Sequence, residues 1–171
     1  MSEPIAGSFR PELKRRWWAN TVDVARCAAE TSDGRRFALG YRGNGRKRVY
    51  TVSTPGGEVL AFSRPRPASG WRSFFNDRTQ FLDAASGHVI LERSSLFSPA
   101  QVRFGEEEVR CRHRLRKWFR VVFGSEHFEF ESRCFHLEVR FLVRTPELLL
   151  PALCCGYMDY VIQSEQSNSG G

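Results

Sequence analysis

The segment from residue 148 to residue 162 constrains the fold more than any other part of the sequence. It reads LLLPALCCGYMDYVI and is apolar on every side. The preceding residues 145–147 (TPE) form a helix start, with a capping threonine, a proline at the first position and an acid in the first turn. A helix that is apolar all round must be buried in protein or lie in a membrane. A bilayer crossing needs about 20 apolar residues, and this shorter segment contains Pro151 and Asp159. We therefore expect a helix that is buried within the protein.

Much of the remaining chain alternates apolar and polar residues with a period of two. Residues 127–133 and 135–143 show this alternation, which is typical of half-buried strands, and glycine-containing turns separate such runs. Two stretches, residues 49–64 (VYTVSTPGGEVLAFSR) and 79–94 (TQFLDAASGHVILERS), align at an offset of 30 residues. Each contains a glycine turn between two strand-like runs. The pattern indicates similar hairpins in series, which is a meander.

The length and composition favour one domain. The chain has 171 residues, of which 41% are hydrophobic and 26% charged, as in an ordinary globular protein. A meander of about ten or more strands must split into two sheets or close into a barrel. In a β protein, a helix can be covered on all sides inside a closed barrel, so the apolar segment favours closure. We expect residues 1–12 to form a loose N-terminal arm, residues 13–163 a single barrel domain and residues 164–171 a disordered tail.

A resemblance to a known superfamily supports the same fold. The hairpins VYTVSTPGGEVLAF and TQFLDAASGHVILE, the strand HLEVRFLVR and the terminal LLLPALCCGYMDYVI together resemble the tubby-like C-terminal superfamily. That superfamily takes in tubby proteins, plant LURP-one-related proteins and phospholipid scramblases. The resemblance covers roughly residues 35–163 and implies a mainly β fold, a closed meander β-barrel of about twelve strands around a buried C-terminal α-helix. It also implies phosphoinositide or membrane association. The acidic calcium-binding segment of scramblases has no counterpart before the helix, where TPELLL stands.

A run of arginines is the strongest candidate for a binding surface. The net charge is +7, and only three of the 26 basic residues are lysines. If residues 109–118 (VRCRHRLRKW) form a strand, alternate arginines project from one face, with neighbours about 6.8 Å apart, close to the spacing of phosphates or lipid headgroups. Acids on neighbouring strands, or residues 106–108 (EEE), could neutralise them internally, or an external anion could. The candidate anion-binding residues are Arg110, Arg112, Arg114, Arg116 and Lys117.

The cysteines point to a reducing compartment. Their number is odd, none forms a CxxC pair, and no apolar signal-like segment lies within residues 1–16, so we expect free buried thiols and a cytoplasmic protein, with peripheral attachment to a membrane as an option. Two Cys-x-His pairs do not reach the spacing of zinc sites, and nothing marks a thiol as activated. We therefore predict no metal, no cofactor and no catalytic residue. The five cysteines are Cys27, Cys111, Cys134, Cys154 and Cys155.

Two other functions compete with membrane binding. Glu129, Glu131 and Arg133 resemble the metal- and phosphate-binding motif of triphosphate tunnel enzymes, whose acids must point into the barrel. The arginines could also bind single-stranded nucleic acid, although no RNP, helix-turn-helix or zinc-finger motif is present. We expect a non-enzymatic module that binds anionic partners. Phosphoinositide or an acidic membrane surface is the first choice, the tunnel phosphohydrolase and nucleic-acid binding are the alternatives, and the oligomeric state is left open.

Overall fold

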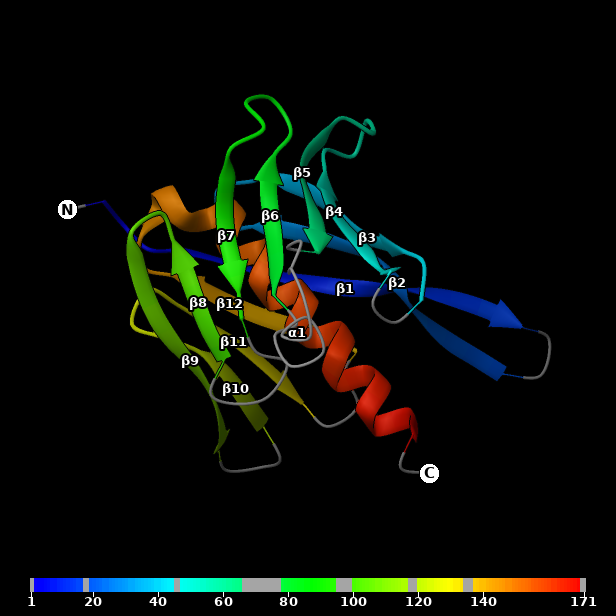
Figure 1. The fold of residues 1–171 in the computed structure, drawn as a ribbon. Coiled ribbons are helices and arrows are strands. Elements are labelled where there is room, and N and C mark those ends of the chain that lie inside the picture. Colours follow the sequence, from blue (N-terminus) through cyan, green and yellow to red (C-terminus); the bar gives the residue numbers. More distant parts are fainter. Residues whose placement is uncertain are drawn as a thin grey trace, which may run out of the picture.

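The protein is a closed barrel of antiparallel strands (Figure 1). The computed structural model describes residues 2–16, 19–44, 47–65, 78–94, 100–116, 120–133 and 137–169. Within these residues each strand pairs with the next in the chain, and the first pairs with the twelfth to close the barrel. The elements are β1 (Ile5–Arg16), β2 (Ala19–Thr31), β3 (Arg36–Arg42), β4 (Val49–Ser53), β5 (Val59–Pro65), β6 (Thr79–Asp83), β7 (Val89–Arg93), β8 (Ala100–Phe104), β9 (Glu107–Arg116), β10 (Arg120–Gly124), β11 (Phe128–Arg133), β12 (Val139–Val143), the 3-10 helix η3 (Pro146–Leu148) and α1 (Leu149–Ser169).

The apolar helix occupies the barrel interior. Residues 151–161 of α1 are all buried, and the helix contacts β2, β4 and β7 while it lines a cavity shared with β9 to β12. Figure 1 shows α1 passing through the middle of the barrel, from the side that carries the N-terminus to the opposite side. The predicted fold, a closed barrel around a buried C-terminal helix, is confirmed. Among the described residues, no helix combines the length and apolar character that a bilayer crossing requires.

The two aligned hairpins, β4–β5 and β6–β7, share their local irregularity. In each hairpin the register shifts by one residue near the turn, where the second strand has an unpaired residue: Leu60 in the first hairpin and Ile90 in the second. Each turn contains a glycine with a positive φ angle, 95° at Gly57 and 72° at Gly87, a conformation that residues with a side chain rarely adopt. The bulges bend the strands where a closed barrel requires curvature.

Both predicted termini need correction. The segment assigned to a loose arm contributes β1, which begins at Ile5, buries Phe9 completely and pairs with β2 and β12. Without this strand the barrel would keep two open edges. At the other end, α1 continues to Ser169, so all the described residues of the predicted tail are helical. A helix that is fixed inside the lumen adds further turns at little cost, even through polar residues, because only nucleation is unfavourable.

Candidate functional site

The arginines of β9 lie on the outer face of the barrel. Val109 and Cys111 are buried toward the lumen, whereas Arg110, Arg112 and Arg114 are exposed, in the alternation that a strand imposes. The predicted face is therefore correct, and its direction is outward. Arg116 also lies on this face, and Lys117 is outside the described residues.

Acids on β11 neutralise the arginines at one edge of this surface. Glu131 contacts Arg116 at 3.8 Å and Arg120 at 3.2 Å. Glu129 contacts Arg116 at 3.9 Å and Arg144 at 3.3 Å. The expectation that neighbouring strands supply acids thus holds for Arg116. These pairs are partly exposed, and each is worth about 0–1 kcal/mol.

The other three arginines of β9 have no acidic partner among the residues that the structure describes. Within the described ranges, Arg110, Arg112 and Arg114 form no ion pair or hydrogen bond through their side chains. The strand register explains why, because neutral residues lie directly opposite them: Gln101 on β8 opposite Arg110, Gly124 on β10 opposite Arg112, and Val122 on β10 opposite Arg114. We call Arg110, Arg112 and Arg114 the β9 arginine row.

The acidic triplet 106–108 does not neutralise this row. Glu108 contacts Arg103 on β8 at 3.6 Å, and Glu107 contacts His127 at 2.7 Å. Glu106 lies in the turn between β8 and β9 and is exposed. The internal source of acids that the sequence suggested is therefore engaged elsewhere or points to solvent.

Exposed leucines gather at one end of the barrel. Leu115 is 77% exposed, Leu13 60% and Leu137 56%. In a meander, the β1–β2, β9–β10 and β11–β12 connections lie at the same end, and the C-terminal end of α1 emerges there as well. Leu115 follows Arg114 in the chain but projects from the opposite face of β9, and it is exposed because it lies at the end of the barrel.

The lumen holds a charged cluster that the sequence analysis missed. Arg93 on β7 is 1% exposed, and its Nη2 lies 3.3 Å from Oδ1 of Asp159 on α1. The Nε2 atom of His113 lies 3.0 Å from each carboxylate oxygen of Asp159. Beside the cluster is a cavity of about 250 Å³, whose polar lining includes His113, Asp159, Ser132 and Gln163. A buried acid requires a cationic partner. Asp159, the one acid in the apolar segment 148–162, was therefore the sequence signal that could have predicted this cluster.

The described cysteines are structural. Cys27, Cys111, Cys154 and Cys155 are free and buried, as predicted, while Cys134 lies outside the described residues. Burial raises the pKa of the Cys27 thiol to about 12 and raises the pKa of Cys154 further. A hydrogen bond with Cys111, together with burial, raises the pKa of Cys155. The raised pKa values favour the protonated thiols of Cys27, Cys154 and Cys155 at neutral pH.

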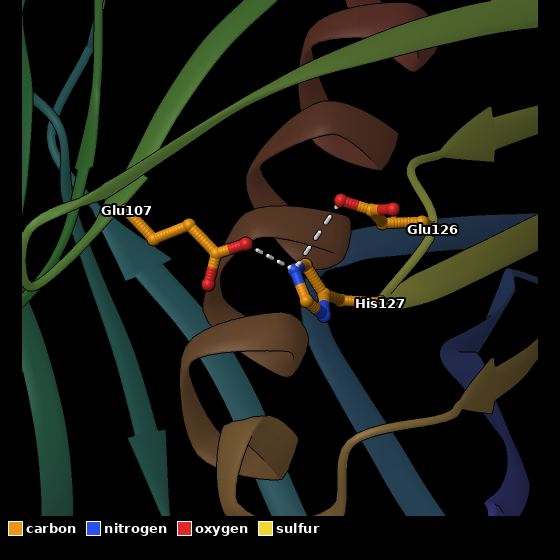
Figure 2. Close-up of side chains that lie close together, drawn as sticks. All are labelled: Glu107, Glu126 and His127. Atoms are coloured by element: carbon orange, nitrogen blue, oxygen red, sulfur yellow. Dashed lines mark hydrogen bonds and ion pairs between the residues drawn. The ribbon is translucent and has the colours of Figure 1, made fainter.

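A histidine and two glutamates meet at the opposite end of the barrel (Figure 2). Nε2 of His127 lies 2.7 Å from Oε1 of Glu107 and 3.8 Å from Oε1 of Glu126. Glu107 begins β9, whereas Glu126 and His127 lie in the connection from β10 to β11. Nothing in the sequence pointed to this cluster, because Glu107 precedes Glu126 by 19 residues and His127 by 20 residues and meets them only through strand pairing.

The tunnel motif does not have the geometry that its chemistry requires. Phe128 and Phe130 point to the lumen and are buried, so Glu129 and Glu131 point outward, where they pair with arginines. The side chain of Arg133 is outside the described part of the chain. Helix α1 fills the space that a polyphosphate would occupy.

Comparison of the chain with family models, with curated proteins and with solved structures gave no match. The barrel itself is shown by the structure, and the resemblance to the tubby-like superfamily stays a prediction.

Proposed function

We propose that this protein is a non-enzymatic binding module that attaches to acidic, phosphoinositide-containing membrane surfaces through the β9 arginine row. One observation carries the proposal: three neighbouring guanidinium groups project from one face with no anionic partner among the described residues. Such a module would act at a cytoplasmic leaflet, where anionic lipids are concentrated, as a peripheral protein.

The electrostatics favour an external anion. Alternate residues on one strand face are about 6.8 Å apart, and two like charges at that distance repel by about 0.6 kcal/mol in bulk water. An anion between them converts this repulsion into attraction, and arginine binds phosphate oxygens through two parallel hydrogen bonds. Each basic side chain near an acidic membrane contributes about 1 kcal/mol, so the row contributes about 3 kcal/mol.

The surroundings of the row favour a membrane over a nucleic acid. Single-stranded nucleic-acid sites combine basic grooves with exposed aromatic rings on which bases stack. In the described residues of β8 to β12, every aromatic ring is buried in the barrel. The exposed Leu115 follows the row at the end of β9, on the opposite face of the strand, and an exposed apolar side chain at this barrel end suits the headgroup region of a bilayer.

Liposome co-sedimentation tests the proposal. The wild-type chain is expected to bind vesicles of phosphatidylcholine with phosphatidylinositol bisphosphate and not vesicles of phosphatidylcholine alone. The triple variant R110Q/R112Q/R114Q is expected to bind the acidic vesicles about a hundredfold more weakly, which corresponds to about 3 kcal/mol. The matched control R26Q/R36Q/R42Q removes the same charge from β2 and β3, which are five and six strands away around the barrel, and is expected to keep binding.

Three outcomes would overturn the proposal. The first is equal binding to neutral and acidic vesicles. The second is an equal loss in the triple variant and its control, which would indicate net charge alone. The third is displacement of the protein from acidic vesicles by single-stranded RNA at equimolar phosphate, with tight RNA binding at about 50 mM salt, which would assign the row to nucleic acid.

A further inference from the structure

We propose that Glu107, Glu126 and His127 form a binding site for a divalent transition-metal ion, with Zn²⁺ as the best fit. The three side chains each offer one ligand atom, and these atoms all lie within 4.8 Å of one another. Figure 2 shows both carboxylates directed at the same imidazole nitrogen. This cluster lies at the end of the barrel away from the exposed leucines and is independent of the β9 arginine row.

His127 is held in place on several sides. Its Nδ1 atom lies 3.1 Å from Oγ1 of Thr145, just before η3, and its ring packs edge-on against Phe104 at 6.5 Å between centroids. Its backbone carbonyl accepts a hydrogen bond of 2.7 Å from the backbone N–H of Arg144. When Nδ1 donates to the threonine hydroxyl, Nε2 is left facing the carboxylates. Metal-binding histidines are oriented in this way by a hydrogen bond at the other ring nitrogen.

The carboxylates can move to a coordinating distance. Two ligands bound at about 2.0–2.1 Å to a tetrahedral zinc ion lie about 3.3 Å apart. The distances from Nε2 to the two glutamate oxygens, 2.7 Å and 3.8 Å, lie on either side of that value. The side chain of Glu126 is 78% exposed and that of Glu107 53%, so both carboxylates have room on the solvent side for small rotations. Water would complete the coordination, as in zinc sites with three protein ligands.

The mixture of ligand atoms selects the class of metal. Mg²⁺ and Ca²⁺ prefer oxygen ligands alone, whereas an imidazole nitrogen suits zinc and the later transition metals. Two carboxylates balance the charge of a divalent ion. A metal ion binds the lone pair of Nε2, so a proton present on that nitrogen would leave to solvent, while a proton on Nδ1 can stay directed at Thr145.

The metal would join three connections of the barrel. Glu107 follows the β8–β9 turn, Glu126 and His127 lie between β10 and β11, and Thr145 lies between β12 and η3. Within the described residues, the side chains of Glu107 and His127 join the first two segments, and the backbone hydrogen bond between Arg144 and His127 joins the last two. A ligand that binds the folded chain and not the unfolded chain raises the melting temperature. The site therefore acts as a staple for this end of the barrel.

Isothermal titration of the full chain with ZnCl₂ tests the proposal. One ion per chain is expected to bind, and E107Q, E126Q and H127Q are each expected to weaken binding at least about tenfold. The control variants E58Q and H88Q alter an exposed glutamate and an exposed histidine in turns at the same barrel end and are expected to keep wild-type affinity. Zinc is expected to raise the melting temperature of the wild-type chain by about 4 °C or more, and not that of E126Q.

Co²⁺ as a substitute separates this site from the thiols. A cobalt complex of nitrogen and oxygen ligands lacks the charge-transfer absorption of cobalt thiolates. A bound cobalt spectrum without thiolate absorption, abolished in H127Q, supports the site. Three results would overturn it: thiolate absorption in the bound form, unchanged zinc affinity in E107Q and E126Q, or no zinc binding at about 1 mM. Any of these would leave His127 and Glu107 as an ordinary ion pair.

Discussion

Arg93 and the β9 arginine row are two strands apart in one barrel wall, yet they have opposite surroundings. Arg93 points into the lumen, is 1% exposed and is paired with Asp159 of α1. The arginines of the row point to solvent, and the residues opposite them are neutral. A buried charge without a counter-charge costs several kcal/mol, so the interior must supply its own acid. Outside, water solvates the guanidinium groups, so the fold tolerates arginines without partners.

The difference separates structural charges from charges available for binding. An exposed arginine contributes little to stability, whereas a buried pair affects stability strongly when one member is lost. A cluster of like charges that the fold does not require is a better candidate for recognition than a pair that the fold does require.

Asp159→Ala is expected to lower the free energy of unfolding by about 3–5 kcal/mol, because it leaves Arg93 charged in the lumen without its acid. Chemical denaturation followed by circular dichroism measures the change. The matched control is Glu131→Ala, which removes an acid from exposed pairs with Arg116 and Arg120 and is expected to cost about 1 kcal/mol or less.

The double variant Arg93→Met/Asp159→Leu sharpens the same comparison. Replacing both members of a buried pair by apolar residues is often neutral or stabilising, so the double variant is expected to recover much of the loss. If Asp159→Ala lowers the free energy of unfolding no more than Glu131→Ala does, the lumen cluster is not required for stability.

The sequence predicted the barrel because its signals were long and periodic. The alternation in residues 127–143 and the uniformly apolar segment at 148–162 each leave few structural options, and together they require closure. The first strand was missed because Gly7 and Pro11 interrupt its alternation, although Ile5 and Phe9 keep the inward phase. The predicted helix was too short because the polar composition of residues 164–171 indicated disorder. In the structure, α1 continues through residues 164–169 from its buried part.

The candidate sites divide along the same line. Local alternation predicts residue by residue that the β9 arginines share one face, whereas the outward direction of that face is known only from the structure. Strand register decides which arginines have an acid nearby. Glu131 on β11 lies opposite Val122 on β10 and not opposite an arginine of β9. The residues paired with Arg110 and Arg112 are neutral. Register joins residues that are distant in sequence, as it does for Glu107 and His127. A single sequence does not reveal such pairs before the strands are placed.

Gly156→Ala is expected to lower the free energy of unfolding by about 1–3 kcal/mol, because an added Cβ would lie 2.3 Å from ring atoms of Phe130. The ring is packed between Phe9 and Phe141, with centroids 6.2 Å and 5.7 Å away, which limits its retreat. Thermal denaturation measures the loss, and Gly56→Ala, whose Cβ would meet only Thr54 at 3.8 Å, serves as the neutral control. Equal melting temperatures for the two variants would show that the lumen is loosely packed around α1.

The smallest effect on stability is expected from the β9 arginine row. R110Q/R112Q/R114Q removes three exposed charges that have no ion pair within the described ranges, so the free energy of unfolding is expected to change by no more than about 0.5 kcal/mol. We expect a slight gain in the free energy of unfolding, because the substitutions remove the mutual repulsion between neighbouring guanidinium groups. Added salt is expected to reduce this gain by screening. Urea denaturation at low and at high ionic strength measures both. A loss above about 1 kcal/mol would instead show that the fold requires these arginines. In that case, weaker membrane binding by this variant would reflect unfolding and would no longer separate binding charges from structural ones.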